Sequence, residues 1–199
     1  LECPHPIRKI LRDARTSGVV LDVGNLSAVA ISHVHADHSS GLEGLGFYSR
    51  FVLGRRVKLV AHPEVLETLW QEKLSPGMGR LTLLGSPAPI QTKLDEFFGV
   101  CPLSEQEEVH VGPFVISCKK TVHQVPTTAF KVKANGKCLG YSSDTSFDQT
   151  LIDWFSDADL VLHETGPRIH TPLEKLVALP QSVRARLRLI HYPDDFDAA

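Results

Sequence analysis

Short apolar runs recur along the chain, and most of them are followed directly by polar residues. Runs at 26–32, 57–61 and 158–162 lack regular polar alternation, which is typical of strands covered on both faces. A last strand is expected over 188–191. Apolar positions at helical spacing predict helices over 6–15, 42–49, 63–73, 147–155, 173–179 and 182–188.

The middle of the chain has a different pattern, with stronger alternation and clear turn signals. Segments 128–134 and 137–142 flank Asn135-Gly136, which predicts a tight hairpin. A strand over 109–118 is expected to bend at Gly112-Pro113. Residues 75–90 are rich in glycine and proline and predict a loop that forms a mobile wall of a cleft. Helices mixed with such strands predict an α+β fold in which helices cover the outer faces of sheets.

Composition limits the class of protein. The 199 residues are 42% hydrophobic and 22% charged, with a formal net charge of −2, as expected for one globular domain over 1–199. No apolar run approaches the roughly 20 residues that cross a bilayer. The four cysteines form no C-x-x-C pair, which favours a reducing, cytoplasmic location. The single methionine is Met78, so we expect that some N-terminal sequence is missing.

A dense cluster of metal-type donors follows the first predicted strand. The sequence H-x-H-x-D-H places His33, His35, Asp37 and His38 within six residues. Neutral imidazole and carboxylate are ligands that zinc prefers. Single donors lie near the ends of later strands: His123, Asp144 and His191.

The alternative for any one of these histidines is an ordinary surface or core side chain. Four adjacent donors after an apolar strand have no good packing explanation, because burying them unpaired is costly. The cluster therefore predicts a metal site.

These motifs, in this order, resemble the metallo-β-lactamase superfamily over nearly the whole chain. The resemblance implies a four-layer αβ/βα sandwich, two β-sheets flanked by helices, with two metal ions at one edge. It also implies that the N-terminal strands of the fold precede Leu1. Segment 21–24 is similar to an early motif of the family but lies too close to the cluster, so we interpret Asp22 as a turn residue.

The resemblance also implies a ligand set for two divalent ions, with zinc expected and manganese or iron accepted by the same ligands. His33, His35 and His123 would hold the first ion, and Asp37, His38 and His191 the second. Asp144 would bridge them. Such a dinuclear site makes hydroxide available near neutral pH for hydrolysis. The presence of His38 and Asp144 argues against β-lactam hydrolysis, and His35 argues against the di-iron flavoprotein branch.

A further segment resembles the tRNA 3′-processing endonuclease (tRNase Z) branch. The stretch His163-Glu164-Thr165 ends a predicted strand, and Ile169-His170-Thr171 follows. The resemblance implies that Glu164 orients His170, which protonates the leaving oxygen as a general acid. We therefore assign catalytic roles to Asp37, Glu164 and His170. The alternative is that Glu164 and His170 are ordinary strand-end and loop residues.

The net charge of −2 and the absence of a basic arm disfavour tRNA, although an RNA end stays open as a substrate. The resemblance, which extends to the small phosphodiesterases on this fold, implies a phosphodiesterase that acts on a cyclic nucleotide or another small cyclic phosphate. We expect no membrane partner, and a homodimer is allowed. Two alternatives stay open. One is a lactonase or glyoxalase II-like thioesterase, and the other is a non-catalytic metal-binding or sensing module of a larger protein.

Overall fold

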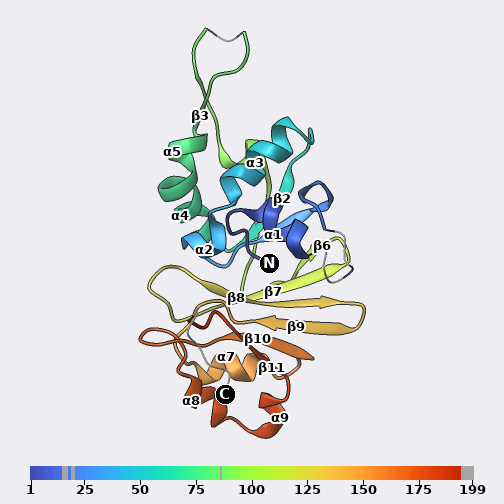
Figure 1. Cartoon of the computed structure of the whole chain (residues 1–199), viewed down its shortest axis with the longest axis vertical. Helices are drawn as coiled ribbons and strands as arrows, with labels where there is room; N and C mark the ends of the chain where they lie inside the picture. The colour runs from blue at the N-terminus through green and yellow to red at the C-terminus, as the bar shows by residue number, and fades with distance from the viewer. Residues whose placement is uncertain (15–17, 19–20, 86, 194–199) are drawn as a thin grey trace. The chain divides into compact units, whose positions relative to one another are not determined.

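The computed structural model describes residues 1–14, 18, 21–85 and 87–193, and the chain divides into two compact units. The first unit is Leu1–Pro102 and the second is Leu103–Ala199. Each has its own sheet and its own hydrophobic core (Figure 1). Helices together with parallel and antiparallel strands confirm the predicted α+β class. The assignment of 1–199 to one domain stays a prediction.

The first unit is built on a parallel three-stranded sheet with the order β1-β2-β5. Its strands are β1 (Ala28–Ala30), β2 (Val57–Ala61) and β5 (Phe98–Pro102). The predicted strand at 57–61 is confirmed, and as the central strand it is buried at every residue except Lys58. Parallel neighbours require crossover connections, and helices supply both crossovers.

Helices of the first unit surround this sheet. They are α1 (Ile7–Asp13), η2 (Val23–Asn25), α2 (Ala36–Ser39), α3 (Leu42–Phe51), α4 (Pro63–Thr68), η3 (Leu69–Leu74), α5 (Ser75–Met78) and α6 (Leu94–Phe97). The predicted helix over 6–15 is confirmed as far as Asp13, and its last residue, Arg15, lies outside the described residues. Asp22 caps η2 by accepting a hydrogen bond from Gly24 N at 2.8 Å, which confirms its turn role.

The stretch 75–90, predicted as a loop, is more ordered than expected. It contains α5 and two short strands, β3 (Arg80–Leu81) and β4 (Ile90–Gln91), which pair antiparallel. The pair and the chain between its strands extend away from α5 as an arm (green in Figure 1). The sequence predicts no basic arm, and this arm carries a single charged side chain, that of Arg80.

The second unit is built on a six-stranded sheet with the order β11-β10-β9-β8-β7-β6. Its strands are β6 (Val109–Val111), β7 (Phe114–Lys120), β8 (Thr128–Ala134), β9 (Lys137–Tyr141), β10 (Leu160–Glu164) and β11 (Leu187–Ile190). Its helices are α7 (Gln149–Trp154), α8 (Leu173–Val177) and α9 (Gln181–Arg184). Strands β6 to β9 are antiparallel, whereas β9, β10 and β11 run parallel.

Two tight turns shape the antiparallel half of this sheet. Asn135 (φ 51°) and Gly136 (φ 71°) connect β8 to β9 as the sequence predicts. The predicted bent strand over 109–118 is instead a hairpin, because Gly112 has a positive φ of 58° and Val111 pairs with Phe114. Among the residues that the structure describes, no helix has both the length and the apolar character needed to cross a bilayer.

Candidate functional site

The first unit gathers the four donors of the H-x-H-x-D-H motif where β1 runs out. His33 is fully buried, and its Nε2 lies 3.0 Å from His35 Nδ1. His35 is the N-cap residue of the single-turn helix α2, which carries Asp37 and His38. His38 Nε2 lies 3.2 Å from Asp37 Oδ2, and the His33 and His38 rings are 4.1 Å apart between centroids. Because the strand leads straight into this turn, donors that are adjacent in sequence also converge in space.

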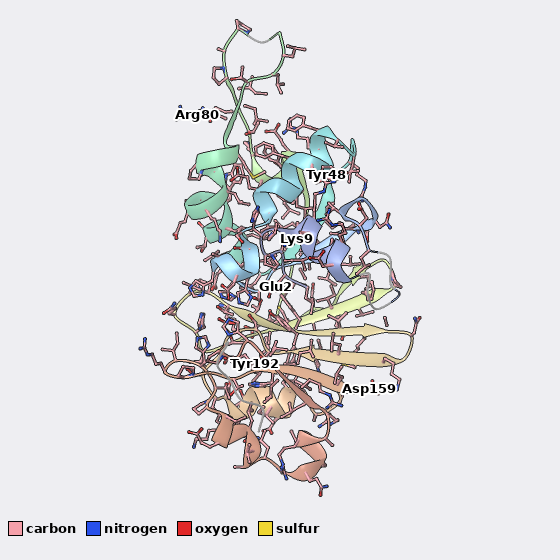
Figure 2. All side chains as sticks on the ribbon, in the orientation of Figure 1. Glu2, Lys9, Tyr48, Arg80, Asp159 and Tyr192 are labelled. Carbon is pink, nitrogen blue, oxygen red and sulfur yellow. The ribbon has the colours of Figure 1, made fainter. Side chains whose placement is uncertain are left out.

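Glu2, which was not predicted as part of the site, contacts this cluster on the Nδ1 side of His38. Glu2 (Figure 2) places Oε1 3.4 Å from His38 Nδ1, and its Oε2 accepts a hydrogen bond from Ser32 N at 3.3 Å. Ser32 Oγ in turn lies 2.9 Å from His33 Nδ1. Because an oxygen lies near Nδ1 of both His33 and His38, Nε2 is the nitrogen of each ring that could hold a metal ion. No local motif marks Glu2, since its partners lie 30 or more residues away.

The second unit gathers its donors by strand topology. Strands β9, β10 and β11 are parallel, so their carboxyl ends lie at one edge of the sheet. Asp144 follows β9, Glu164 ends β10, and His191 follows β11. Ser143 and His191 have left-handed backbones, with φ of 53° and 55°, a conformation that non-glycine residues adopt mainly at constrained or functional sites.

Asp144 lies at the centre of these donors and is 3% exposed. Its Oδ2 is 3.8 Å from His123 Nε2 and 3.6 Å from His191 Nε2. Two ligand atoms, each about 2.1 Å from one tetrahedral ion, lie about 3.4 Å apart. These separations therefore fit donors that face a shared cation better than they fit direct hydrogen bonds. Ligand atoms of Asp144, His170 and His191 all lie within 4.8 Å of one another.

Glu164 and His170 form the predicted pair. His170 Nδ1 lies 3.1 Å from both carboxylate oxygens of Glu164, which is fully buried. Thr145 N also donates to Glu164 Oε1, at 2.5 Å. Burial raises the pKa of Glu164, while the bonds from Thr145 N–H and His170 oppose that rise. The contact that the resemblance implied between these two side chains is thus present in the structure.

Hydrogen bonds tie the three loops of this edge together. Thr121 Oγ1 donates to Asp144 O at 2.8 Å, which fixes the loop that carries His123. Thr171 Oγ1 donates to Thr145 O at 2.9 Å, and Ser146 Oγ donates to Ile169 O at 2.7 Å. These bonds hold the His170 loop against the Asp144 loop.

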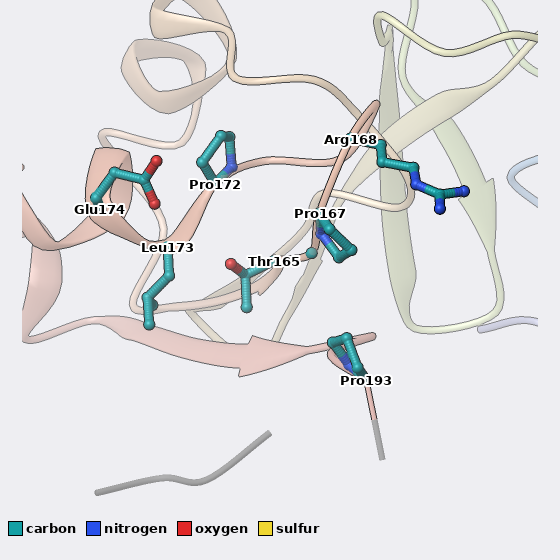
Figure 3. A pocket seen from close by; sticks show the side chains of 8 residues that line it. Thr165, Pro167, Arg168, Pro172, Leu173, Glu174 and Pro193 are labelled. Carbon is teal, nitrogen blue, oxygen red and sulfur yellow. The ribbon is translucent and has the colours of Figure 1, made fainter. Parts of the chain in front are cut away.

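Two cavities adjoin the His170 loop within the second unit. One, of about 420 Å³, is lined by residues 165–168 and by Pro172, Leu173, Glu174 and Pro193 (Figure 3). The other, of about 630 Å³, is lined by residues 166–170 and 191–193, which include His170 and His191. Space for a small molecule therefore lies directly beside these two imidazoles.

Within the first unit, the structure brings together His33, His35, Asp37 and His38. Within the second, it brings together His123, Asp144, Glu164, His170 and His191. Their roles as ligands and catalytic groups stay predictions, as does the sharing of ions between the two sets.

Comparison with known proteins gives a clear family match. The family model described as "Anti-Pycsar_Apyc1: Anti-Pycsar protein Apyc1" matches residues 1–199. The chain is similar to the Anti-Pycsar protein Apyc1 of Bacillus phage 010DV004, with 30% identity over 99% of this chain and 78% of that protein.

Solved structures confirm the predicted fold. A metallo-β-lactamase fold protein, YhfI from Bacillus subtilis, matches with a TM-score of 0.68 and 21% identity over 97% of this chain and 74% of its own. The short form of human tRNase Z matches with a TM-score of 0.61 and 18% identity over 96% of this chain and 80% of its own. The predicted metallo-β-lactamase fold is confirmed, and within that fold the chain belongs to the family of the Anti-Pycsar protein Apyc1.

Proposed function

We propose that this chain is a phosphodiesterase that opens the phosphate ring of cyclic nucleotides with the help of two divalent metal ions, most readily zinc. Its family and fold place it among the metal-dependent hydrolases. The observation that carries the choice of a phosphodiester is the contact between His170 and the buried Glu164 beside the donors of the second unit.

The donor sets support two ions rather than one. Four donors lie in the first unit and three in the second, and a carboxylate such as Asp144 has two oxygens with which to bridge. We propose that the two sets hold the ions jointly, with His33, His35 and His123 on one, Asp37, His38 and His191 on the other, and Asp144 on both. Bound there, the ions would supply a nucleophilic water at neutral pH and stabilise charge on the phosphate.

His170 supplies what the ions do not. Cleavage of a phosphodiester expels an alkoxide, which is a poor leaving group unless it receives a proton. Glu164 accepts the Nδ1 hydrogen of His170, so the proton available for transfer sits on Nε2. Glu164 is therefore a positioning residue, which orients the imidazole.

The cavity and the charge favour a small substrate. A volume of about 630 Å³ falls in the range of small-molecule pockets, about 300–1,000 Å³. The net charge of −2 and an arm whose one charged residue is Arg80 offer little to hold a polyanionic RNA.

The test is hydrolysis of purine and pyrimidine 3′,5′-cyclic nucleotides by the zinc- or manganese-loaded protein, followed by separation of the nucleoside monophosphates. We expect ring opening, and a loss of kcat of about 10²–10⁴-fold for His170→Ala. The wild type and His170→Ala are also assayed with a lactone and with an acyl-glutathione. Because a thiolate leaves without a proton donor, His170→Ala should lose less activity on the acyl-glutathione than on cyclic nucleotides. Hydrolysis of either compound in preference to every cyclic nucleotide would overturn the proposal.

A further inference from the structure

One lysine reaches the donor segment of the first unit from a distant helix. Lys73 Nζ lies 2.6 Å from Val34 O and 2.6 Å from Ser39 Oγ. Val34 stands between His33 and His35, and Ser39 follows His38 directly. A single ammonium group therefore contacts the segment at two places, between its first two donors and directly after its last one.

Ser39 extends this contact into a small network. Its hydroxyl is buried and lies 2.8 Å from Val34 O and 2.9 Å from His35 O. The backbone N–H of Ser39 also donates to His35 O at 3.0 Å. Lys73 and Ser39 together thus satisfy the carbonyl groups of Val34 and His35, which belong to the two peptides on either side of the His35 side chain.

A π-helical turn, η3, carries Lys73. Leu69 and Leu74 are both buried, although residues five apart in an α-helix point about 140° from each other. The wider turn brings both leucines to the core, and Ser75 N–H donates to Trp70 O, five residues back. In an α-helix, residue 73 would share the core face with Leu69. Such turns occur often at functional sites.

The position of Lys73 has an energetic cost. Partial burial lowers the pKa of Lys73 from its ordinary value, and the nearby Asp37 opposes that effect. A lysine whose only task was solubility would gain nothing from this placement, since an exposed ammonium is better solvated.

We propose that Lys73 is a positioning residue for metal binding: by holding Val34 O and Ser39 Oγ, it fixes the directions in which His33, His35 and His38 present their nitrogens. This inference rests on the metal binding in the proposed function and adds to it a residue outside the ligand set.

The test compares Lys73→Met with Lys73→Arg, with Lys58→Met as a control that removes an exposed lysine of the same unit. Zinc affinity is measured by competition with a chromophoric chelator, and unfolding midpoints are measured with zinc and with EDTA. Loss of a residue that supports metal ligands typically weakens metal binding 10–100-fold. We expect that loss for Lys73→Met, a smaller loss for Lys73→Arg, and none for Lys58→Met.

Kinetics separate positioning from a general loss of structure. We expect Lys73→Met to lower kcat while KM stays within about twofold. The reason is that the substrate cavity is lined by residues 166–170 and 191–193, and Lys73 is not among them. If Lys73→Met does not fold in EDTA, Ser39→Ala, which removes only the bridging hydroxyl, should show a weaker form of the same loss of zinc affinity. Zinc binding as tight as that of the wild type in the folded variant would overturn the proposal. A wild-type protein that binds no zinc would instead overturn the proposed function.

Discussion

Glu2 shows how one side chain can determine the behaviour of a distant donor. Its backbone has a φ of 61°, unusual for a glutamate, and its carboxylate faces both His38 Nδ1 and Ser32 N. A carboxylate behind a ligating imidazole fixes the tautomer and raises the basicity of the other nitrogen.

We therefore expect Glu2→Ala to weaken zinc binding about 10–100-fold in a chelator competition titration. Glu2→Gln keeps an oxygen that can accept from Ser32 N, so its loss should be smaller. Glu67→Gln changes an exposed glutamate of the same unit and is the control. Equal affinities for Glu2→Ala and the wild type would show that His38 needs no such support.

His163 is expected to make the stability of the fold, and not its catalytic activity, depend on pH. It is buried in β10, and its Nδ1 donates to Glu164 O at 2.7 Å. Burial lowers the pKa of His163 below its ordinary value of 6.5. The unfolded chain therefore binds a proton at a higher pH than the native chain does. The stabilising contribution is fully present above pH 6.5 and is lost as the pH falls towards the lower native pKa.

The free energy of unfolding should thus decrease from pH 6.5 to pH 5 by at most about 1.4 kcal/mol per pH unit from this one group. His163→Gln, which keeps an N–H donor, should show a shallower decrease. Urea unfolding in EDTA at several pH values measures both. If the free energy of unfolding falls equally steeply with pH in the variant and the wild type, groups other than His163 cause the loss of stability in acid.

At the scale of elements, the helices and strands that could be predicted are those marked by a pattern of a few neighbouring residues. The Asn135-Gly136 hairpin, β2 and the strand that leads into the donor cluster could be predicted, because turn chemistry and continuous apolar runs act over a few residues. The strand β5 was not predicted, since Gly99 interrupts its short apolar run. The π-helical turn was not predicted either, because it depends on which residues the core accepts at Leu69 and Leu74.

The same difference between local patterns and distant contacts decides which residues of the candidate site could be predicted. The donors could be found because metal ligands belong to few residue types and follow strand ends. The supporting residues Glu2 and Lys73 could not, because each acts through contacts made 30 or more residues away in the chain. Ordinary charged residues carry no local mark of such contacts.

The arm formed by β3 and β4 affects the choice between RNA and a small substrate. Between Arg80 and Gln91 it carries threonine, leucine, glycine, serine, proline, alanine and isoleucine, and Leu84 is fully exposed. Affinity for nucleic acid depends on lysine and arginine contacts to phosphates, each of which releases counterions. The arm offers one such side chain at its base.

We accordingly expect tRNA to bind with a dissociation constant in the nonspecific range, about 10⁻⁴–10⁻⁶ M, at physiological salt. Filter binding over a salt series measures both the affinity and its salt dependence. An arm variant with Leu83→Lys and Leu84→Lys gives a positive comparison, because it adds two phosphate contacts and should steepen the salt dependence. Nanomolar binding by the wild type would restore RNA as a substrate.

At the scale of the whole molecule, the question is whether the two donor sets act as one. Four proposed ligands belong to Leu1–Pro102 and three to Leu103–Ala199. If the proposal of joint binding is right, metal links the stabilities of the two units. A ligand that binds only the native state raises the free energy of unfolding by about 4 kcal/mol when its free concentration is a thousand times its dissociation constant.

His35 and His123 test this linkage, because the proposal assigns them to the same ion from different units. We expect His35→Ala and His123→Ala each to remove most of the zinc-dependent rise in the unfolding midpoint. The double variant should lose little more, since an ion already lost cannot be lost again. His110→Ala, which removes an exposed imidazole, should leave the zinc effect unchanged. Losses that simply add in the double variant would mean that each unit binds metal by itself, and the proposed ligand assignment would then be wrong.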